Sequence, residues 1–105
     1  MNILSWLKQS LICGNGPNFC EADDKYQRIY LGNYESLLIR ISGTELYKQL
    51  SEFECFYRCG RAHIVNLNEI SRVPSDGVVF QNGMQLRLPR AVLSGLRTAF
   101  FDYFN

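Results

Sequence analysis

The chain has 105 residues, of which 47% are hydrophobic and 20% are charged, so it is long enough for one soluble domain with a modest core. It has no apolar run long enough to cross a membrane and no signal-peptide pattern at its start, and we therefore expect a cytoplasmic protein with no membrane association. The net charge of +1 is low for a nucleic-acid binder, but residues 55–105 carry six arginines, no lysine and three acidic residues, a local net charge of +3.

Residues 1–16 form an N-terminal segment that precedes a domain of residues 17–105. Apolar residues at helical spacing predict a short helix over Asn2–Ile12, although a strand over Ser10–Cys13 is an alternative. The domain then begins with a strand over Asn18–Ala22 and a turn at Asp23–Lys25. A second strand follows over Tyr26–Leu31, and its even-numbered and odd-numbered residues are expected on opposite faces of a sheet.

The middle of the chain predicts a strand, a helix and a pair of strands. The strand covers Ser36–Ile41, and the helix that follows is expected to be N-capped by Thr44 and to continue to Phe53. Strands over Phe53–Arg58 and His63–Asn66 flank a basic tip with the sequence Arg-Cys-Gly-Arg.

The last third predicts a hairpin and a long helix. After a strand over Glu69–Val73 and a turn at Pro74–Gly77, the Asn-Gly pair at residues 82–83 predicts a hairpin, and a second basic tip, Arg87–Arg90, follows it. An apolar stripe predicts a helix over Arg90–Phe104. Seven or eight short strands with two or three helices and no βαβ alternation predict a mostly β, antiparallel domain with peripheral helices.

Three segments of the chain, in this order, match a family pattern. Phe19–Tyr26 is similar to an early strand that ends in an acidic turn and a tyrosine. Phe56–Asn66 is similar to the signature Phe-x-Arg-x-His-Arg-Ser-Tyr-x-Val-Asn, and Asn82–Arg90 is similar to a hairpin that ends in Ser-Arg. Together, over about residues 17–104, they resemble the LytTR-type DNA-binding domain of bacterial transcriptional regulators.

The chain departs from this family pattern at four positions. Gly60 stands where the family usually has histidine, Ala62 and Pro89 stand where it usually has serine, and His63 replaces the usual aromatic residue. These changes remove side chains that could contact phosphates or bases, so we expect an altered affinity or site preference.

The resemblance implies an elongated antiparallel β-sandwich with two or three peripheral helices, whose loops enter successive major grooves of double-stranded DNA. At the matching positions it implies base contacts by Gln27, Arg61 and Arg90, because glutamine can read adenine and arginine can read guanine. Lys25, Arg58 and Arg87 would then position the DNA backbone. The alternative for all these basic residues is an ordinary solvated surface, and the function implied is that of a sequence-specific transcriptional regulator.

Two other functions stay open on the sequence alone. The chain could be a protein-interaction module that keeps the fold without binding DNA, and the aromatic C-terminal stripe that ends in Phe104 would suit a homodimer contact. It could also be a thiol redox sensor, since Cys59 lies between arginines that could lower its pKa, although an inert, half-buried thiol is the interpretation that we favour.

The remaining reactive side chains indicate no catalytic or metal site. The four cysteines form no CxxC pair, and we expect them to be reduced and mostly buried, although two disulfides are an alternative. The single histidine, His63, is expected to be a strand residue, and Asn66 is expected to close a turn by bonding the backbone. The acidic residues from Glu21 to Asp24 are interpreted as a polar turn. We therefore predict no metal, no cofactor and no enzymatic activity.

Overall fold

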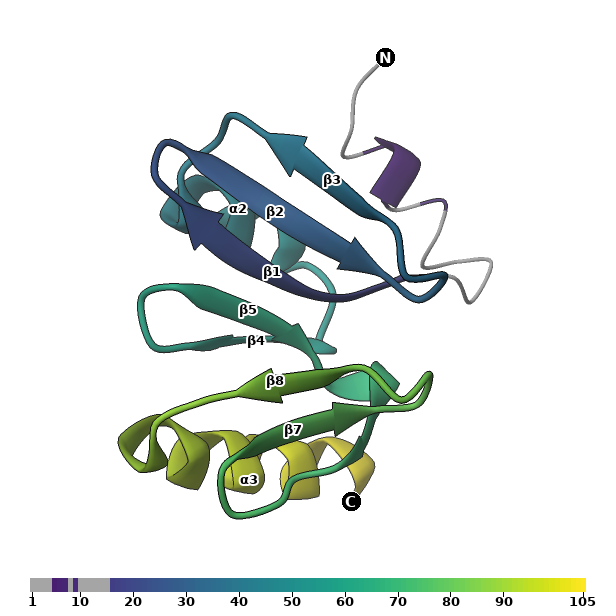
Figure 1. Cartoon of the computed structure of the whole chain (residues 1–105), viewed down its shortest axis with the longest axis vertical. Coiled ribbons are helices and arrows are strands. Elements are labelled where there is room, and N and C mark those ends of the chain that lie inside the picture. Colours follow the sequence, from purple (N-terminus) through teal and green to yellow (C-terminus); the bar gives the residue numbers. More distant parts are fainter. Residues whose placement is uncertain (1–4, 8, 10–15) are drawn as a thin grey trace.

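The computed structural model of the chain describes residues 5–7, 9 and 16–105, and these residues form two antiparallel sheets flanked by helices (Figure 1). The strands are β1 Pro17–Asp23, β2 Tyr26–Leu31, β3 Ser36–Ile39, β4 Phe56–Cys59, β5 His63–Asn66, β6 Ile70–Arg72, β7 Gly77–Phe80 and β8 Gln85–Arg87. The helices are α2 Gly43–Leu50, the 3-10 helix η1 Leu67–Glu69 and α3 Arg90–Phe104. The prediction of a mostly β, antiparallel domain is confirmed.

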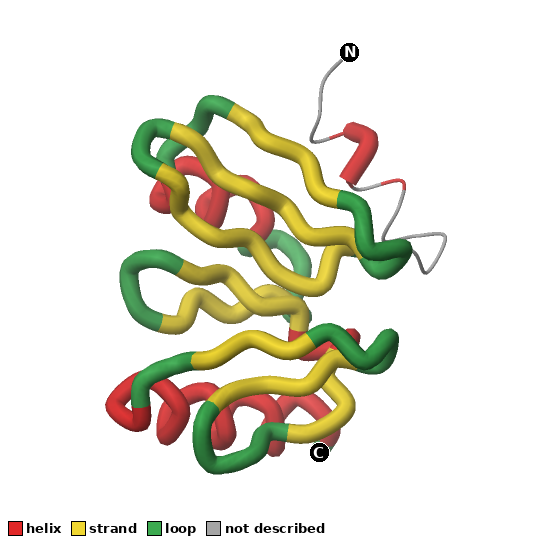
Figure 2. The backbone as a smooth tube through the Cα atoms, in the orientation of Figure 1, coloured by secondary structure: helices red, strands yellow, loops and turns green. Residues whose placement is uncertain are grey.

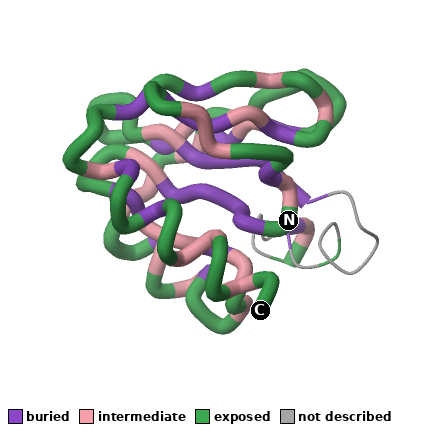
Figure 3. Tube along the Cα trace, turned by 90° about the horizontal axis from the view of Figure 1, so that it is seen from below, coloured by how far each residue is buried: buried purple, intermediate pink, exposed green. Residues whose placement is uncertain are grey.

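The five-stranded sheet is the central layer of the molecule, with strand order β3-β2-β1-β5-β4. One of its faces packs against α2, where Leu46 and Leu50 contact a cluster that includes Ile29 and Ile64. Its other face packs against α3 and the second sheet, whose order is β6-β7-β8. Phe19 of β1 stacks on Phe80 of β7 across this boundary, with ring centroids 5.3 Å apart. Figure 3 shows the buried segments between the layers and exposed residues along the loops.

The alternation predicted for β2 is present and orients its side chains. Gln27, Ile29 and Leu31 are buried on the face toward α2, whereas Arg28 and Tyr30 on the opposite face are half-buried. β2 pairs with β1 through the tight turn at Asp24, which has a φ of 56°. Aspartate tolerates this left-handed conformation better than most residues, so the backbone conformation of the turn explains why an aspartate is suitable at position 24.

Several predicted boundaries are wrong by a few residues. Helix α2 begins at Gly43, and its N-cap is Ser42 and not Thr44, because the Ser42 hydroxyl accepts a hydrogen bond from the Glu45 amide at 3.1 Å. β3 ends at Ile39. β4 begins at Phe56 and not at Phe53, because the amide of Phe56 donates to the carbonyl of Phe53 and so turns the chain before the strand.

Asn66 ends β5 and joins two distant segments. Its side-chain carbonyl accepts from the Asn68 amide at 3.1 Å and so caps η1, which the sequence had not predicted. Its side-chain amide donates to the Pro17 carbonyl at 2.9 Å and ties this point to the start of β1. The prediction that Asn66 closes a turn is confirmed.

The second sheet contains a bulge that reorients one arginine. Ile70 pairs with Phe80, but Arg72 pairs with Val79, so the register shifts by one residue around Ser71. Without the shift, Ile70 and Arg72 would face the same side, because residues two apart in a strand share a face. The bulge therefore places Arg72, which is exposed, on the outer face of the sheet.

The β7–β8 turn attaches the second sheet to the first. The Asn82 side chain donates to the Gly32 carbonyl at 2.9 Å, and it accepts from the Asn18 side chain at 3.2 Å and from the Met84 amide at 2.9 Å. The Tyr34 hydroxyl also donates to the Asn82 carbonyl. The predicted Asn-Gly hairpin is thus confirmed, and it holds the two sheets together as well as turning the chain.

The N-terminal segment is only partly described. Ser5, Trp6, Leu7 and Gln9 are helical, and the rest of the helix predicted over Asn2–Ile12 lies outside the described residues, as does the alternative strand over Ser10–Cys13. Among the described helices, none is long and apolar enough to span a bilayer.

Candidate nucleic-acid interface

Four loops meet along one edge of the molecule, which we call the loop edge. It comprises residues 24–25, 40–43, 60–62 and 88–90, and the loops lie on the left side of Figure 2. The amide of Ala22 donates to the carbonyl of Ala62 at 2.8 Å and joins the first loop to the third. A Cβ placed on Gly60 would lie 3.6 Å from Val92 in the first turn of α3, so the third loop contacts the fourth. A Cβ on Gly43 would lie 3.9 Å from the carbonyl of Arg61, so the second loop contacts the third.

The loop edge concentrates positive charge. It contains four basic residues and one acidic residue, Asp24, for a net charge of +3 against +1 for the whole chain. All four bases are exposed: Lys25, Arg40, Arg61 and Arg90. In the part of the chain that the structure describes, the ion pairs are Arg28–Asp23 and His63–Glu21, so none of the four is neutralised.

Arg61 and Arg90 come from neighbouring loops of this edge. Arg61 lies in the β4–β5 turn directly after Gly60, whose φ of +70° favours glycine over the histidine usual in the family. Arg90 is the first residue of α3, after the N-cap Pro89, and the contact between Gly60 and Val92 brings the two loops together. Arg87 is exposed on the outer face of the second sheet, opposite Gly77.

Gln27 and Arg58 lie below these exposed residues and not among them. Gln27 is 4% exposed, because it is on the face of β2 that packs under α2. Its Nε2 lies 3.4 Å from the position that a Cβ of Gly43 would occupy, and Nη2 of Arg58 lies 3.5 Å from the same point. Nη1 of Arg58 donates to the Thr44 hydroxyl at 3.1 Å. The resemblance implied a Gln27 side chain that projects into a groove, so its burial is a difference from that expectation.

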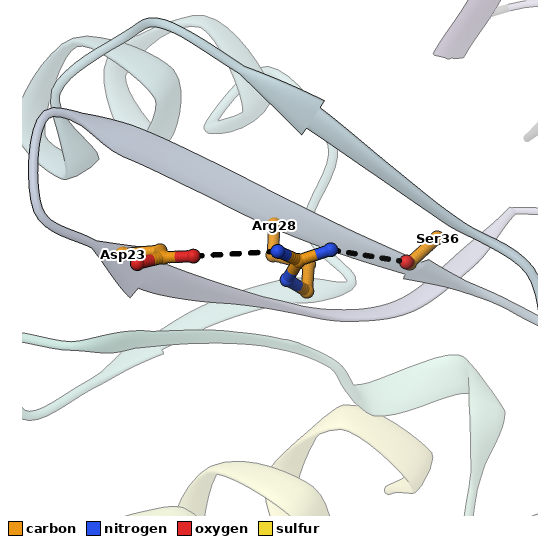
Figure 4. Close-up of polar contacts among 3 residues, drawn as sticks. All are labelled: Asp23, Arg28 and Ser36. Atoms are coloured by element: carbon orange, nitrogen blue, oxygen red, sulfur yellow. Dashed lines mark hydrogen bonds and ion pairs between the residues drawn. The ribbon is translucent and has the colours of Figure 1, made fainter.

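Two basic side chains beside the loop edge are engaged with acids of β1. Arg28 lies between Asp23, at 3.4 Å, and the Ser36 hydroxyl, at 3.5 Å (Figure 4). His63 lies 2.9 Å from Glu21 on the adjacent strand. These pairs agree with the interpretation of the acidic residues as a polar turn, and His63 is a residue of strand β5, as expected. Sequence analysis missed the pairs because they depend on strand register.

The cysteines do not match the redox hypothesis. Cys59 is 1% exposed, and burial raises its pKa from 9.0 to about 11, whereas a reactive thiol needs a lowered pKa. Burial also raises the pKa of Cys20, to about 12. Cys20, Cys55 and Cys59 are free thiols, as expected, while Cys13 lies outside the described residues. Among the described residues, no group of three or more His, Cys, Asp or Glu side chains lies close enough together to hold a metal ion.

Comparisons with known proteins agree with the sequence resemblance. The family model described as "LytTr DNA-binding domain" matches residues 18–101. Among solved structures, the chain is similar to the LytTr DNA-binding domain of a response regulator from Bacillus cereus, with 25% sequence identity, 79% of each chain covered and a TM-score of 0.59. A search of curated proteins found no match. Since the family model spans most of the chain and the fold agrees with a solved member, the chain belongs to the LytTr DNA-binding domain family.

Proposed function

We propose that this protein binds duplex DNA sequence-specifically as a transcriptional regulator, and that the loop edge is its DNA-binding surface. The observation that carries the proposal is the convergence on one edge of four exposed basic residues, with a single acid among them, none of which forms an ion pair with another described residue. Such a surface attracts the phosphate backbone, and membership of a family of DNA-binding domains supports the same assignment.

Arg61 and Arg90 are the residues that we assign to base reading. A guanidinium group presents two parallel donors, which match the two acceptors of guanine in the major groove. Neither side chain is held in an intramolecular ion pair among the described residues, so DNA binding breaks no such pair. Lys25 and Arg87, which are both exposed, are assigned to backbone phosphates.

The length of the domain suits binding along duplex DNA. Its longest axis measures 38 Å, and the loop edge runs along that axis in Figure 1. One turn of B-DNA is about 34 Å long. A domain of this length lies alongside about one turn of the duplex, so its loop edge can face one side of the DNA.

Selection from random duplex DNA, followed by fluorescence anisotropy with the enriched sequence, tests the proposal. Arg61→Ala and Arg90→Ala should each weaken specific binding by about 1–3 kcal/mol and relax the base preference at one position. Lys48→Ala removes the same charge from the last turn of α2, away from the loop edge, and should have little effect. No enriched motif, or an affinity that does not fall with rising salt, would contradict the proposal.

We also propose that α3 provides a homodimer contact. Leu93 and Leu96 of this helix are buried in the core, but Phe101 and Phe104 are 67% and 58% exposed near its end. Exposed aromatic side chains are enriched at protein interfaces. Sedimentation should show a dimer that Phe101→Ser weakens. A monomer at all concentrations would argue against the contact, and a stable hetero-complex without DNA affinity would favour an interaction module.

A further inference from the structure

We propose that Gln27, Arg58 and the first turn of α2 form a preformed site for one phosphate group of the DNA backbone. This inference rests on the proposed function and deepens it. It assigns to Gln27 a backbone contact in place of the base contact that the family resemblance implies. The site lies where β2, α2 and the β4–β5 turn meet, on the loop edge.

Gln27 supplies a polar group that the fold itself does not use. The residue is 4% exposed, yet no hydrogen bond joins its side-chain amide to another described residue. Among the described residues, every side-chain nitrogen or oxygen that is fully shielded from solvent has a hydrogen-bond partner. Since the Gln27 amide has no partner among these residues, its tip must be accessible to solvent. It reaches the surface beside Gly43, 3.4 Å from the Cβ position of that glycine. A buried polar side chain is costly unless it is bonded, so an unused donor directed at a surface point indicates a ligand there.

Arg58 directs a second donor to the same point. One side of its guanidinium group is fixed by the hydrogen bond from Nη1 to the Thr44 hydroxyl, at 3.1 Å. The other nitrogen, Nη2, lies 3.5 Å from the Cβ position of Gly43. Because the guanidinium group is already oriented, it loses little side-chain freedom when an anion binds.

The first turn of α2 adds backbone amides and a favourable dipole. The Glu45 amide is capped by Ser42, and the first intrahelical bond runs from the Leu46 amide to the Ser42 carbonyl at 3.0 Å. The amides of Gly43 and Thr44 precede that bond and have no acceptor in the helix. An eight-residue helix carries partial positive charge at this end, where anions bind favourably.

The donors together suit a phosphate better than a base edge, because the Gln27 side chain is buried and does not project far enough to enter a groove. The site offers an amide nitrogen, a guanidinium nitrogen and helix amides, whereas the base reader proposed at this edge, Arg61, lies in the next loop. The Glu45 carboxylate, in the same helix turn, accepts a hydrogen bond from Gln49 at 3.0 Å. A phosphodiester has two non-bridging oxygens and one negative charge, which this set can satisfy. Holding a phosphate here would fix the depth at which Arg61 meets the bases.

A pair of glycine substitutions tests the site without changing the charge of the protein. In Gly43→Ala, the new Cβ lies in ordinary contact with both donors, so the fold is retained and the space for a phosphate oxygen is filled. Gly32→Ala is the matched control, since a Cβ there meets nothing within 4 Å. For the enriched duplex we expect Gly43→Ala, but not Gly32→Ala, to weaken binding about tenfold. The dependence of log K on log salt should also become shallower by about 0.9, with the selected motif unchanged.

A second measurement separates this inference from the proposed function. Titration of the full 15N-labelled chain with inorganic phosphate at constant ionic strength should shift the amides of Gly43 and Thr44 and the Gln27 side-chain amide. Arg58→Ala should abolish those shifts, and Lys48→Ala should not. If the chain binds DNA but Gly43→Ala behaves like Gly32→Ala, the phosphate site is overturned and the proposed function stands. If phosphate shifts the three groups but no duplex binds, the assignment to DNA fails together with the proposed function.

Discussion

Substituting Asn82 by alanine removes its side-chain hydrogen bonds between the two sheets, keeps the bond from the Tyr34 hydroxyl to the main-chain carbonyl of residue 82, and should destabilise the whole domain. The side chain makes three hydrogen bonds, which connect it to the β2–β3 turn, to β1 and to the start of β8. Each bond contributes about 1 kcal/mol, and the Asn18 amide, on a residue that is 1% exposed, would lose its oxygen partner at a cost of about 1 kcal/mol more. We therefore expect a loss of about 3–4 kcal/mol in the free energy of unfolding.

This loss is large for a domain of this size. Small domains are stable by about 5–15 kcal/mol, and each kcal/mol shifts the melting temperature by about 4–8 °C. Urea denaturation followed by circular dichroism measures the change. Asn33→Ala is a suitable control, because its exposed side chain makes one hydrogen bond, at 3.1 Å from the Glu35 amide, and should cost no more than about 1 kcal/mol.

Affinity for DNA provides an independent check on the same variant. Asn82 lies in the β7–β8 turn, at the opposite end of β8 from Arg90, so the loop edge should keep its geometry wherever the protein remains folded. Binding at low temperature should match that of the unmodified chain within about twofold. If Asn82→Ala unfolds with a loss below about 1 kcal/mol, apolar packing and the Tyr34 hydrogen bond are enough to hold the sheets together, and the role assigned to this side chain is refuted.

Three further substitutions or conditions give defined outcomes. Gly77→Ala should lower the melting temperature sharply and disrupt the β7–β8 pairing, since its Cβ would lie 2.1 Å from the Leu86 carbonyl oxygen, and a melt as high as that of the unmodified chain would contradict this. Gly60→Ala should cost about 1 kcal/mol in unfolding experiments, because the φ of +70° strains any side chain while the new Cβ would make only an ordinary contact with Val92, at 3.6 Å. The contribution of Cys59 to stability should be level below pH 9 and fall as the pH rises toward 11, because burial raises its folded-state pKa to about 11 and the folded state then binds the proton more tightly than the unfolded chain; Cys20, whose pKa is raised to about 12, adds a loss in the same direction. Between pH 9 and pH 10 the loss from Cys59 amounts to about 1 kcal/mol, which Cys59→Ala should remove from the pH dependence.

The sequence predicted elements well where one periodicity was unambiguous. The bounds of Tyr26–Leu31, His63–Asn66 and Arg90–Phe104 agree with the structure. The first alternates with a strand period and the last carries an apolar stripe with a helix period, whereas His63–Asn66 is a short apolar run that ends at a turn-forming asparagine. The start of α2 was harder, since Ser42 and Thr44 are both good N-caps. The choice between them depends on which helix phase directs Leu46 and Leu50 at the sheet, and that phase is a tertiary property.

The candidate site shows the same division between local and tertiary information. The two basic tips were visible as arginine-rich loops, and their adjacency follows from packing between the β4–β5 turn and α3. The burial of Gln27 could have been anticipated, because it shares parity with Ile29 and Leu31 in a strand whose apolar face was recognised. The position of Gln27 beside Gly43 could not have been anticipated, because α2 and β2 are brought together only by tertiary packing.

The bulge in β6 has a consequence for how this domain tolerates changes in chain length. Ser71 is the additional residue that separates Ile70, paired with Phe80, from Arg72, paired with Val79. Replacing its exposed side chain should matter little, and deleting the residue would place Arg72 directly after Ile70 in a regular strand, where it still opposes Val79 and stays on the outer face. At this position the domain should therefore tolerate the loss of one residue as well as its substitution, so relatives are expected to vary here in length as well as in sequence.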